Sequence, residues 1–194
     1  MLRKSWILLT AIAPAVPALA VAPPPALPYW VNGTGAWQEA DNAILVSPPS
    51  IFMYAGDTTP SILGQIYKNS VTESPGPAGN VVAQVGFGAF GSDPRFSTWT
   101  WLPATYNLQI GNNDQYTANF SINVPGTYAY TYRFSLDNGG TWTAADLAGT
   151  GSNPPIAFDP NDIGKLTVSD IALPEPAYIG ILALGTTIGL RRRR

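Results

Sequence analysis

The chain has 194 residues, of which 45% are hydrophobic and 11% are charged, so it can form the core of one ordinary domain but has few charges for its surface. It contains no cysteine and no histidine, which excludes disulfide bonds, thiolate zinc sites, cysteine nucleophiles, Ser-His-Asp triads and histidine-bound metals. The 19 glycines and 19 prolines disfavour long helices in the middle of the chain and favour many short strands.

Residues 1–20 have the three parts of a secretory signal peptide. A basic start is followed by an apolar run over residues 6–13 and by the small side chains of Ala18 and Ala20. These two alanines fit the pocket of signal peptidase, so we expect cleavage after Ala20. The alternative is an uncleaved anchor helix, but the apolar run is short and two prolines interrupt the segment.

Residues 21–42 are expected to form an extended spacer, because four of the seven residues from Ala22 to Pro28 are proline. Between residues 21 and 172 the chain has four cationic and eleven anionic side chains, a net charge of −7. Nucleic acid is therefore not expected as a partner, since no basic patch can form. A lone cation such as Arg133 is expected to be paired on a sheet face.

Eight strand-like runs follow, and turn residues such as Pro, Gly and Asn separate them. The runs cover residues 43–46, 51–54, 62–67, 81–87, 97–101, 116–122, 127–134 and 165–168. Short strands with frequent breakers are typical of an all-β antiparallel sandwich, which we predict over residues 43–172.

The clearest strand is residues 127–134, where every second residue is aromatic. A strand places alternate side chains on opposite faces, so the four aromatic residues should lie on one buried face. They are Tyr128, Tyr130, Tyr132 and Phe134. The following Asn138-Gly139 predicts a tight type I′ turn, after which Trp142 returns along the same sheet.

Trp99 and Trp101 are two residues apart and would share one face of a strand. With Tyr106 nearby, they are a candidate platform for sugar rings. The alternative, which we favour, is that they belong to the core, because a domain with so little charge needs large apolar side chains inside.

Two loops rich in Asp and Asn, residues 112–114 and 159–162, carry oxygen ligands of the kind that calcium prefers. Neither has an EF-hand pattern, so we prefer turn capping and predict no metal and no other cofactor. Asp137 and Asp146 can be drawn as a glycosidase pair, but eleven acids on one surface produce such pairs by chance. The sequence therefore predicts no catalytic residue and a protein that is not an enzyme, with a glycan hydrolase as a third hypothesis.

Residues 173–194 have the pattern of a membrane segment. The 14 apolar residues from Ala177 to Leu190 would span about 21 Å as a helix, less than a hydrocarbon core of about 30 Å. Four arginines follow and can snorkel to the headgroups, so they are expected to hold this end in the cytoplasm. They are Arg191, Arg192, Arg193 and Arg194.

The order of Pro174-Glu175-Pro176, an apolar segment and an arginine cluster resembles the PEP-CTERM sorting signal of Gram-negative bacteria. This resemblance implies recognition by an exosortase, a membrane protease-like transpeptidase. It also implies export across the inner membrane, transient anchoring through the apolar helix, and delivery to the cell surface or extracellular matrix. A plain tail anchor is the alternative.

The stretch from Pro125 to Trp142 resembles the penultimate hairpin of immunoglobulin-like modules in secreted bacterial surface proteins and polysaccharide hydrolases. The resemblance implies an immunoglobulin-like sandwich between the signal helix and the short transmembrane helix. We expect an exported protein of structural or adhesive role. The alternative is a carbohydrate-binding module that retains exopolysaccharide through exposed aromatic side chains.

Overall fold

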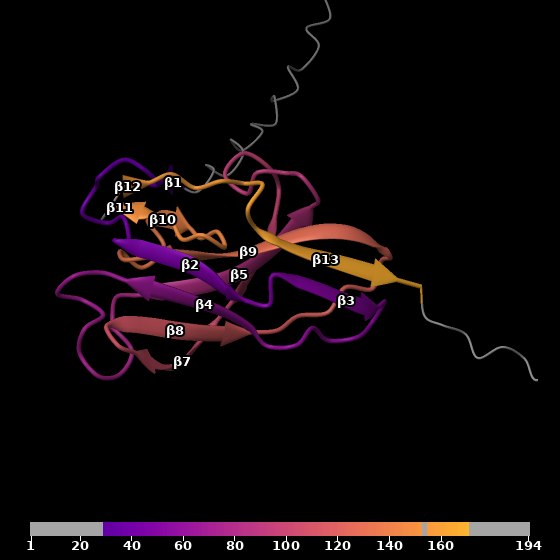
Figure 1. Ribbon diagram of the computed structural model, residues 1–194, viewed down its shortest axis with the longest axis horizontal. Coiled ribbons are helices and arrows are strands. Elements are labelled where there is room, and N and C mark those ends of the chain that lie inside the picture. The colour runs from indigo at the N-terminus through magenta and orange to yellow at the C-terminus, as the bar shows by residue number, and fades with distance from the viewer. Residues whose placement is uncertain (1–28, 153–154, 171–194) are drawn as a thin grey trace, which may run out of the picture.

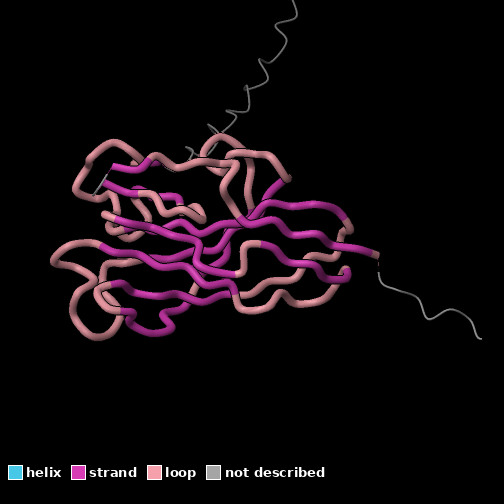
Figure 2. The backbone as a smooth tube through the Cα atoms, viewed as in Figure 1, coloured by secondary structure: helices cyan, strands magenta, loops and turns pink. Residues whose placement is uncertain are grey.

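The computed structural model describes residues 29–152 and 155–170, and these residues form strands and loops only (Figure 2). The prediction of an all-β domain is confirmed for this part of the chain. Its strands are β1 Tyr29–Trp30, β2 Asn42–Ser47, β3 Ser50–Tyr54, β4 Ile62–Tyr67, β5 Val82–Ala89, β6 Thr100–Pro103, β7 Thr105–Ile110, β8 Asn113–Ala118, β9 Gly126–Ser135, β10 Thr141–Ala144, β11 Gly151–Ser152, β12 Pro155–Ile156 and β13 Gly164–Ser169.

The predicted terminal segments lie outside the described residues. These are the signal peptide with Ala18 and Ala20, and the segment with Pro174, Glu175, Pro176 and the four arginines at 191–194. No helix long and apolar enough to cross a membrane occurs within residues 29–152 and 155–170.

Two sheets face each other across one core (Figure 1). The larger has seven strands, in the order β1-β10-β9-β13-β3, with β5 paired to the other side of β9 and β6 paired to β5. The smaller has the order β2-β4-β8-β7. Most pairs are antiparallel, but β13 and β3 are parallel, as are β1 and β10. The arrangement is therefore sandwich-like, with one mixed sheet.

The longest strand, β9, carries the predicted aromatic face of the core. Tyr130, Tyr132 and Phe134 are buried, as predicted, while Tyr128 at the end of the row is half-buried. Tyr132 joins the two sheets, since its hydroxyl donates to the Ile62 carbonyl at 2.7 Å and its ring fills the space beside Gly64. Burial of this hydroxyl with a partner avoids the cost of an unsatisfied polar group.

The hairpin after β9 is the predicted tight turn. Asn138 and Gly139 have φ angles of 58° and 94°, and the Gly140 amide donates to the Asp137 carbonyl at 3.3 Å. Two successive positive φ angles define the type I′ turn that suits a hairpin. The chain then returns as β10, which carries Trp142.

The folded region begins earlier than expected. Residues 29–42, expected as part of an extended spacer, include β1, which pairs with β10. Asn32 accepts from the Ala144 amide at 2.8 Å and donates to the Ala144 carbonyl at 3.0 Å. The prolines predict only the local backbone conformation. The fold of residues 29–42 depends instead on contacts with residues more than a hundred positions away.

Candidate functional site

The two tryptophans predicted as a glycan platform or as core lie in a stack on the outer face of the seven-stranded sheet. The rings of Trp99 and Trp101 are 5.7 Å apart with planes inclined by 24°. The guanidinium carbon of Arg133 lies 4.2 Å from the Trp101 ring centre and 4.0 Å from that of Trp142. We call Trp99, Trp101, Arg133 and Trp142 the tryptophan–arginine ladder.

The sequence of β5 makes room for this ladder. Gly86 and Gly88 face away from the core, and the spaces that their β-carbons would occupy are taken by the rings of Trp101 and Trp99. Any larger residue at these two positions would displace an indole ring. The alternation of glycine in β5 is therefore a packing requirement of the outer face.

Arg133 lies on a sheet face, but it is paired with an amide and with aromatic rings rather than with a carboxylate. Its Nε and Nη2 atoms donate to the Gln84 side-chain oxygen at 2.8 and 2.6 Å. Burial lowers the pKa of Arg133 to about 10, so the group remains charged at neutral pH. A desolvated cation between aromatic faces is stabilised by their quadrupoles.

The ladder does not form the flat, open surface that a sugar platform needs. Trp99 is 8% exposed and Trp142 is 5% exposed. One face of Trp101 is covered by Arg133, and Trp99 donates its indole N–H to the Ser92 hydroxyl at 3.0 Å. These contacts favour the packing role over the platform.

Of the two Asp- and Asn-rich segments, residues 159–162 have the predicted turn-capping contact, whereas Asn113 and Asp114 belong to strand β8. The carboxylate of Asp159 accepts from the Asn161 amide at 2.8 Å. Asp114 is fully buried, accepts from the Ala78 amide at 3.0 Å, and its pKa is raised by burial. Across the described ranges, no group of three or more acidic side chains is placed to hold a metal ion.

Asp137 and Asp146 serve separate turns. Asp137 accepts from the amide and hydroxyl of Thr141 at 2.8 and 2.9 Å; burial alone would raise its pKa, but these hydrogen bonds lower it. Asp146 is buried, accepts from the Asp159 amide at 2.9 Å, and its pKa is raised by that burial. In the part of the chain that the structure describes, no hydrogen bond joins the two carboxylates.

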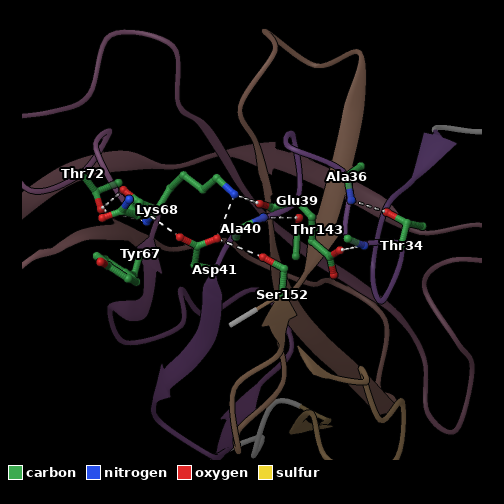
Figure 3. Close-up of polar contacts among 12 residues, drawn as sticks. Thr34, Ala36, Glu39, Ala40, Asp41, Tyr67, Lys68, Thr72, Thr143 and Ser152 are labelled. Carbon is green, nitrogen blue, oxygen red and sulfur yellow. Dashed lines mark hydrogen bonds and ion pairs between the residues drawn. The ribbon is translucent and has the colours of Figure 1, made fainter. Parts of the chain in front are cut away.

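A polar cluster near the start of the fold contains the residue types of a catalytic site (Figure 3). Lys68 Nζ donates to an oxygen of Asp41 at 2.8 Å, and the Ser152 hydroxyl donates to the same carboxylate at 2.9 Å. The buried carboxylate of Glu39 accepts from the backbone amides of Gly33 and Gly35. These groups are saturated by their neighbours, so the cluster fixes residues 31–41 onto the sandwich.

The outer face of the four-stranded sheet has a different chemistry. Ile62, Gly64 and Ile66 of β4 point into the core, so Gln65 lies on the outer side, opposite Gln115 of β8. The alternating strands β4, β8 and β7 place six amide and hydroxyl side chains on this side. We call this surface the amide face; it comprises Gln65, Thr105, Asn107, Asn113, Gln115 and Thr117.

The amides of this face form two pairs. Asn113 donates to the Gln65 side-chain oxygen at 3.2 Å, and Asn107 donates to the Gln115 side-chain oxygen at 2.7 Å. Each amide has two donors and an acceptor, so every pair keeps further hydrogen-bonding capacity. Leu108 and Ile110 at the edge are 42% and 45% exposed. The outward positions of the four strands carry no charged side chain.

This face was not predicted, because the aromatic residues were the candidates for a binding surface. The signal was present in residues 113–117, where Asn113, Gln115 and Thr117 alternate with Asp114 and Tyr116. A period of two in short polar residues indicates a strand with one uncharged, hydrated side.

A small groove lies on the outer face of the seven-stranded sheet, beside the end of β5. It is lined by Phe90, Gly91, Ala129, Pro160, Asn161 and Ile163. The Lys165 ammonium lies 5.3 Å from the centre of the Phe90 ring. The lining is mostly apolar and has one amide side chain, so it lacks the polar groups of an acid–base site.

The fold and these surfaces define an all-β, sandwich-like domain with one covered and one open sheet face. No family model matches the chain. Over 139 residues, 63% of this chain, it is 31% identical to an amylopullulanase of Thermoanaerobacterium saccharolyticum. Amylopullulanases of Thermoanaerobacterium thermosulfurigenes and Thermoanaerobacter thermohydrosulfuricus are each 31% identical, over 137 and 98 residues (61% and 42% of this chain). The chain spans only 7 to 10% of the length of these relatives, so the similarity concerns a small part of each.

Proposed function

We propose that residues 29–170 form a non-catalytic, immunoglobulin-like module that binds neutral polysaccharide on the amide face, as part of an exported surface or matrix protein. The observation that carries this proposal is the uncharged, amide-rich outer face of the four-stranded sheet. The likeness to part of several amylopullulanases, enzymes named for polysaccharide substrates, supports a role beside such polymers. Adhesion to the matrix would follow from this binding.

The chemistry of the amide face fits a neutral sugar polymer. Each sugar hydroxyl both donates and accepts, and so does each side-chain amide. The exposed Leu108 and Ile110 can pack against the apolar C–H faces of sugar rings. The net charge of −7 between residues 21 and 172 disfavours acidic polysaccharides through repulsion.

The test is the retention of the protein on pullulan, a neutral glucan, compared with alginate, an acidic polymer. The double variant Gln65→Ala/Asn107→Ala should weaken pullulan binding about 5- to 150-fold, because two neutral hydrogen-bonding groups contribute about 1 to 3 kcal/mol. Asn123→Ala, an exposed amide in the loop before β9, is the matched control and should leave binding unchanged. Equal binding by the double variant, or no binding by the wild-type protein, would contradict the proposal.

The sorting of the protein remains a proposal that rests on its sequence. We infer removal of residues 1–20 by signal peptidase, exosortase recognition of Pro174-Glu175-Pro176, and display on the surface of a Gram-negative bacterium. Glu175 supplies the one charge of the motif, so Glu175→Ala should leave an unprocessed, membrane-held form. Intact mass measurement decides, since a surface protein that begins near Val21 and still ends in Arg194 would leave only a plain tail anchor.

A further inference from the structure

Exposed apolar side chains gather at one end of the sandwich. Phe52, Tyr54, Phe90 and Val124 are 64%, 41%, 57% and 64% exposed. We call these four residues the apolar rim. Exposed apolar side chains are ordinary when they are scattered, but a group at one place marks an interaction surface.

The sheet register places the rim residues at the end where the chain leaves the fold, with Phe52 and Phe90 on either side of β13 and β9. Tyr54 at the end of β3 lies opposite Ser169 at the end of β13, because these strands are parallel (Figure 1). Val168 lies opposite Gly126, which begins β9 two residues after Val124. Ala89, the last residue of β5 before Phe90, lies opposite Tyr128 of β9.

Backbone contacts hold the rim in place. The Ala55 amide donates to the Ser169 carbonyl at 2.8 Å, and the Gly56 amide donates to the Ile122 carbonyl at 3.0 Å. The Tyr128 hydroxyl donates to the Val124 carbonyl at 2.9 Å. The side chains are therefore presented on a preorganised surface, which lowers the entropic cost of binding.

The rim lies at the end of the fold from which the chain continues to the apolar residues 177–190, and this position indicates what the rim contacts. Seven residues lead from Asp170 to Pro176, and such a stretch reaches at most about 25 Å. With residues 177–190 in a bilayer, the rim cannot lie far from the headgroups. We propose that the apolar rim docks on the interfacial region of the lipid bilayer that holds this segment, which rests on the membrane stage of the proposed function.

The chemistry of the rim fits a zwitterionic lipid surface. Aromatic side chains favour the membrane–water interface, where their rings contact both headgroups and acyl chains. Exposed Asp57 and Asp170 adjoin the rim, with Lys165 beside Phe90 as a nearby cation, and the domain as a whole is acidic, so a strongly anionic lipid surface would repel it. The strands of both sheets lie roughly along one axis that ends near the rim (Figure 1). The amide face lies along the side of this axis, so it would face solvent when the rim contacts the membrane.

The absence of cysteine from the sequence allows a direct test with single labels. The chain without residues 1–20 is placed in phosphatidylcholine vesicles that contain a spin-labelled quencher lipid, and a fluorophore is attached at Val124→Cys, Ser74→Cys or Thr186→Cys. Ser74 is an exposed residue in the loop between β4 and β5, at the opposite end of the sandwich. We expect strong quenching at positions 124 and 186 and little quenching at position 74.

Two results would overturn the docking and separate it from the anchoring. Quenching at position 186 with equal, weak signals at 124 and 74 would show an anchored domain that does not dock. No quenching at 186 would remove both the anchoring and the docking. As a further arm, Phe52→Ser/Phe90→Ser should at least halve quenching at position 124, whereas Trp37→Ser, 69% exposed but outside the rim, should not.

Discussion

The outer faces of the two sheets differ although both sheets pack on the same core. On the seven-stranded sheet, the outward residues of β9 from Ala129 to Ser135 are buried, including Thr131 and Arg133, and indole rings lie over the glycines of β5. On the four-stranded sheet, most of the outward residues are amides, hydroxyls and aliphatics that remain partly exposed, although Gln115 is only 7% exposed. The stacked tryptophans therefore cover part of one sheet, while amides and hydroxyls leave the outer face of the other sheet more open.

The difference follows from the free energy of burying each side chain. An indole ring removes a large apolar area from water, and its N–H needs only one partner, as Trp99 finds in Ser92. An amide gains little from burial because water already satisfies its donors and acceptors. The same alternation of strand residues thus produces a packed layer on one sheet and a hydrated surface on the other.

The largest expected effect concerns the core that supports both faces. Phe134→Ala should lower the free energy of unfolding by about 3 to 5 kcal/mol, because it removes a buried ring that stacks on Tyr132 at 5.6 Å. Urea unfolding measures this loss. Phe96→Ala removes the same atoms from a side chain that is 77% exposed and should change stability by less than about 0.5 kcal/mol. A small loss at Phe134 would contradict its place in the core.

Arg133→Ala should destabilise the covered face by about 3 kcal/mol. The change removes two stacking contacts with indole rings and leaves a cavity between Trp101 and Trp142. Arg95→Ala is the comparison, since Arg95 forms a partly exposed ion pair with Asp93 at 2.7 Å and lies 4.9 Å from the Phe158 ring centre, but it is not held between two indole rings. Its loss should cost about 1 kcal/mol. Equal costs for the two arginines would show that the ladder does not stabilise the fold.

Much of the fold could be predicted because the strands with strict alternation carry their own signal. Residues 62–67 form a strand with the predicted bounds, and Tyr130, Tyr132 and Phe134 are buried as the period of two requires. Strand β7 was missed because its register shifts between Tyr106 and Leu108, which breaks the alternation. Strand β1 was missed because only its distant partner, β10, specifies it.

The neighbours of the candidate site residues could not be predicted from the sequence. The spacing of Trp99 and Trp101 shows that they share a side of the chain, but not that Arg133, from another strand, covers one of them. Likewise, Gln65 and Gln115 become neighbours only through the pairing of β4 with β8. Local patterns identify which residues share a face, whereas strand order decides what lies next to that face.

Asp114 offers a pH test of the four-stranded sheet, since this carboxylate is turned inward beneath the amide face. Burial raises its folded pKa above the unfolded value, so stability should fall as pH rises from the unfolded toward the folded pKa, by at most about 1.4 kcal/mol per pH unit. Asp114→Asn should remove this slope. Asp137, whose pKa is lowered, contributes the opposite slope, with stability lost as pH falls through its folded pKa. Urea unfolding at several pH values would contradict this account if Asp114→Asn left the slope unchanged.

The last prediction compares the same substitution, glutamine to alanine, on the two outer faces, and it includes the smallest expected effect. Gln84→Ala on the covered face removes the acceptor of two guanidinium hydrogen bonds from Arg133 and should cost about 1 to 3 kcal/mol. Gln65→Ala on the amide face removes a side chain whose partner, Asn113, can turn to water, and should cost less than about 0.5 kcal/mol. Thermal unfolding of the two variants measures both. If Gln65→Ala cost as much as Gln84→Ala, the amides of the open face would be needed for folding, and their availability to a polysaccharide would lose its physical basis.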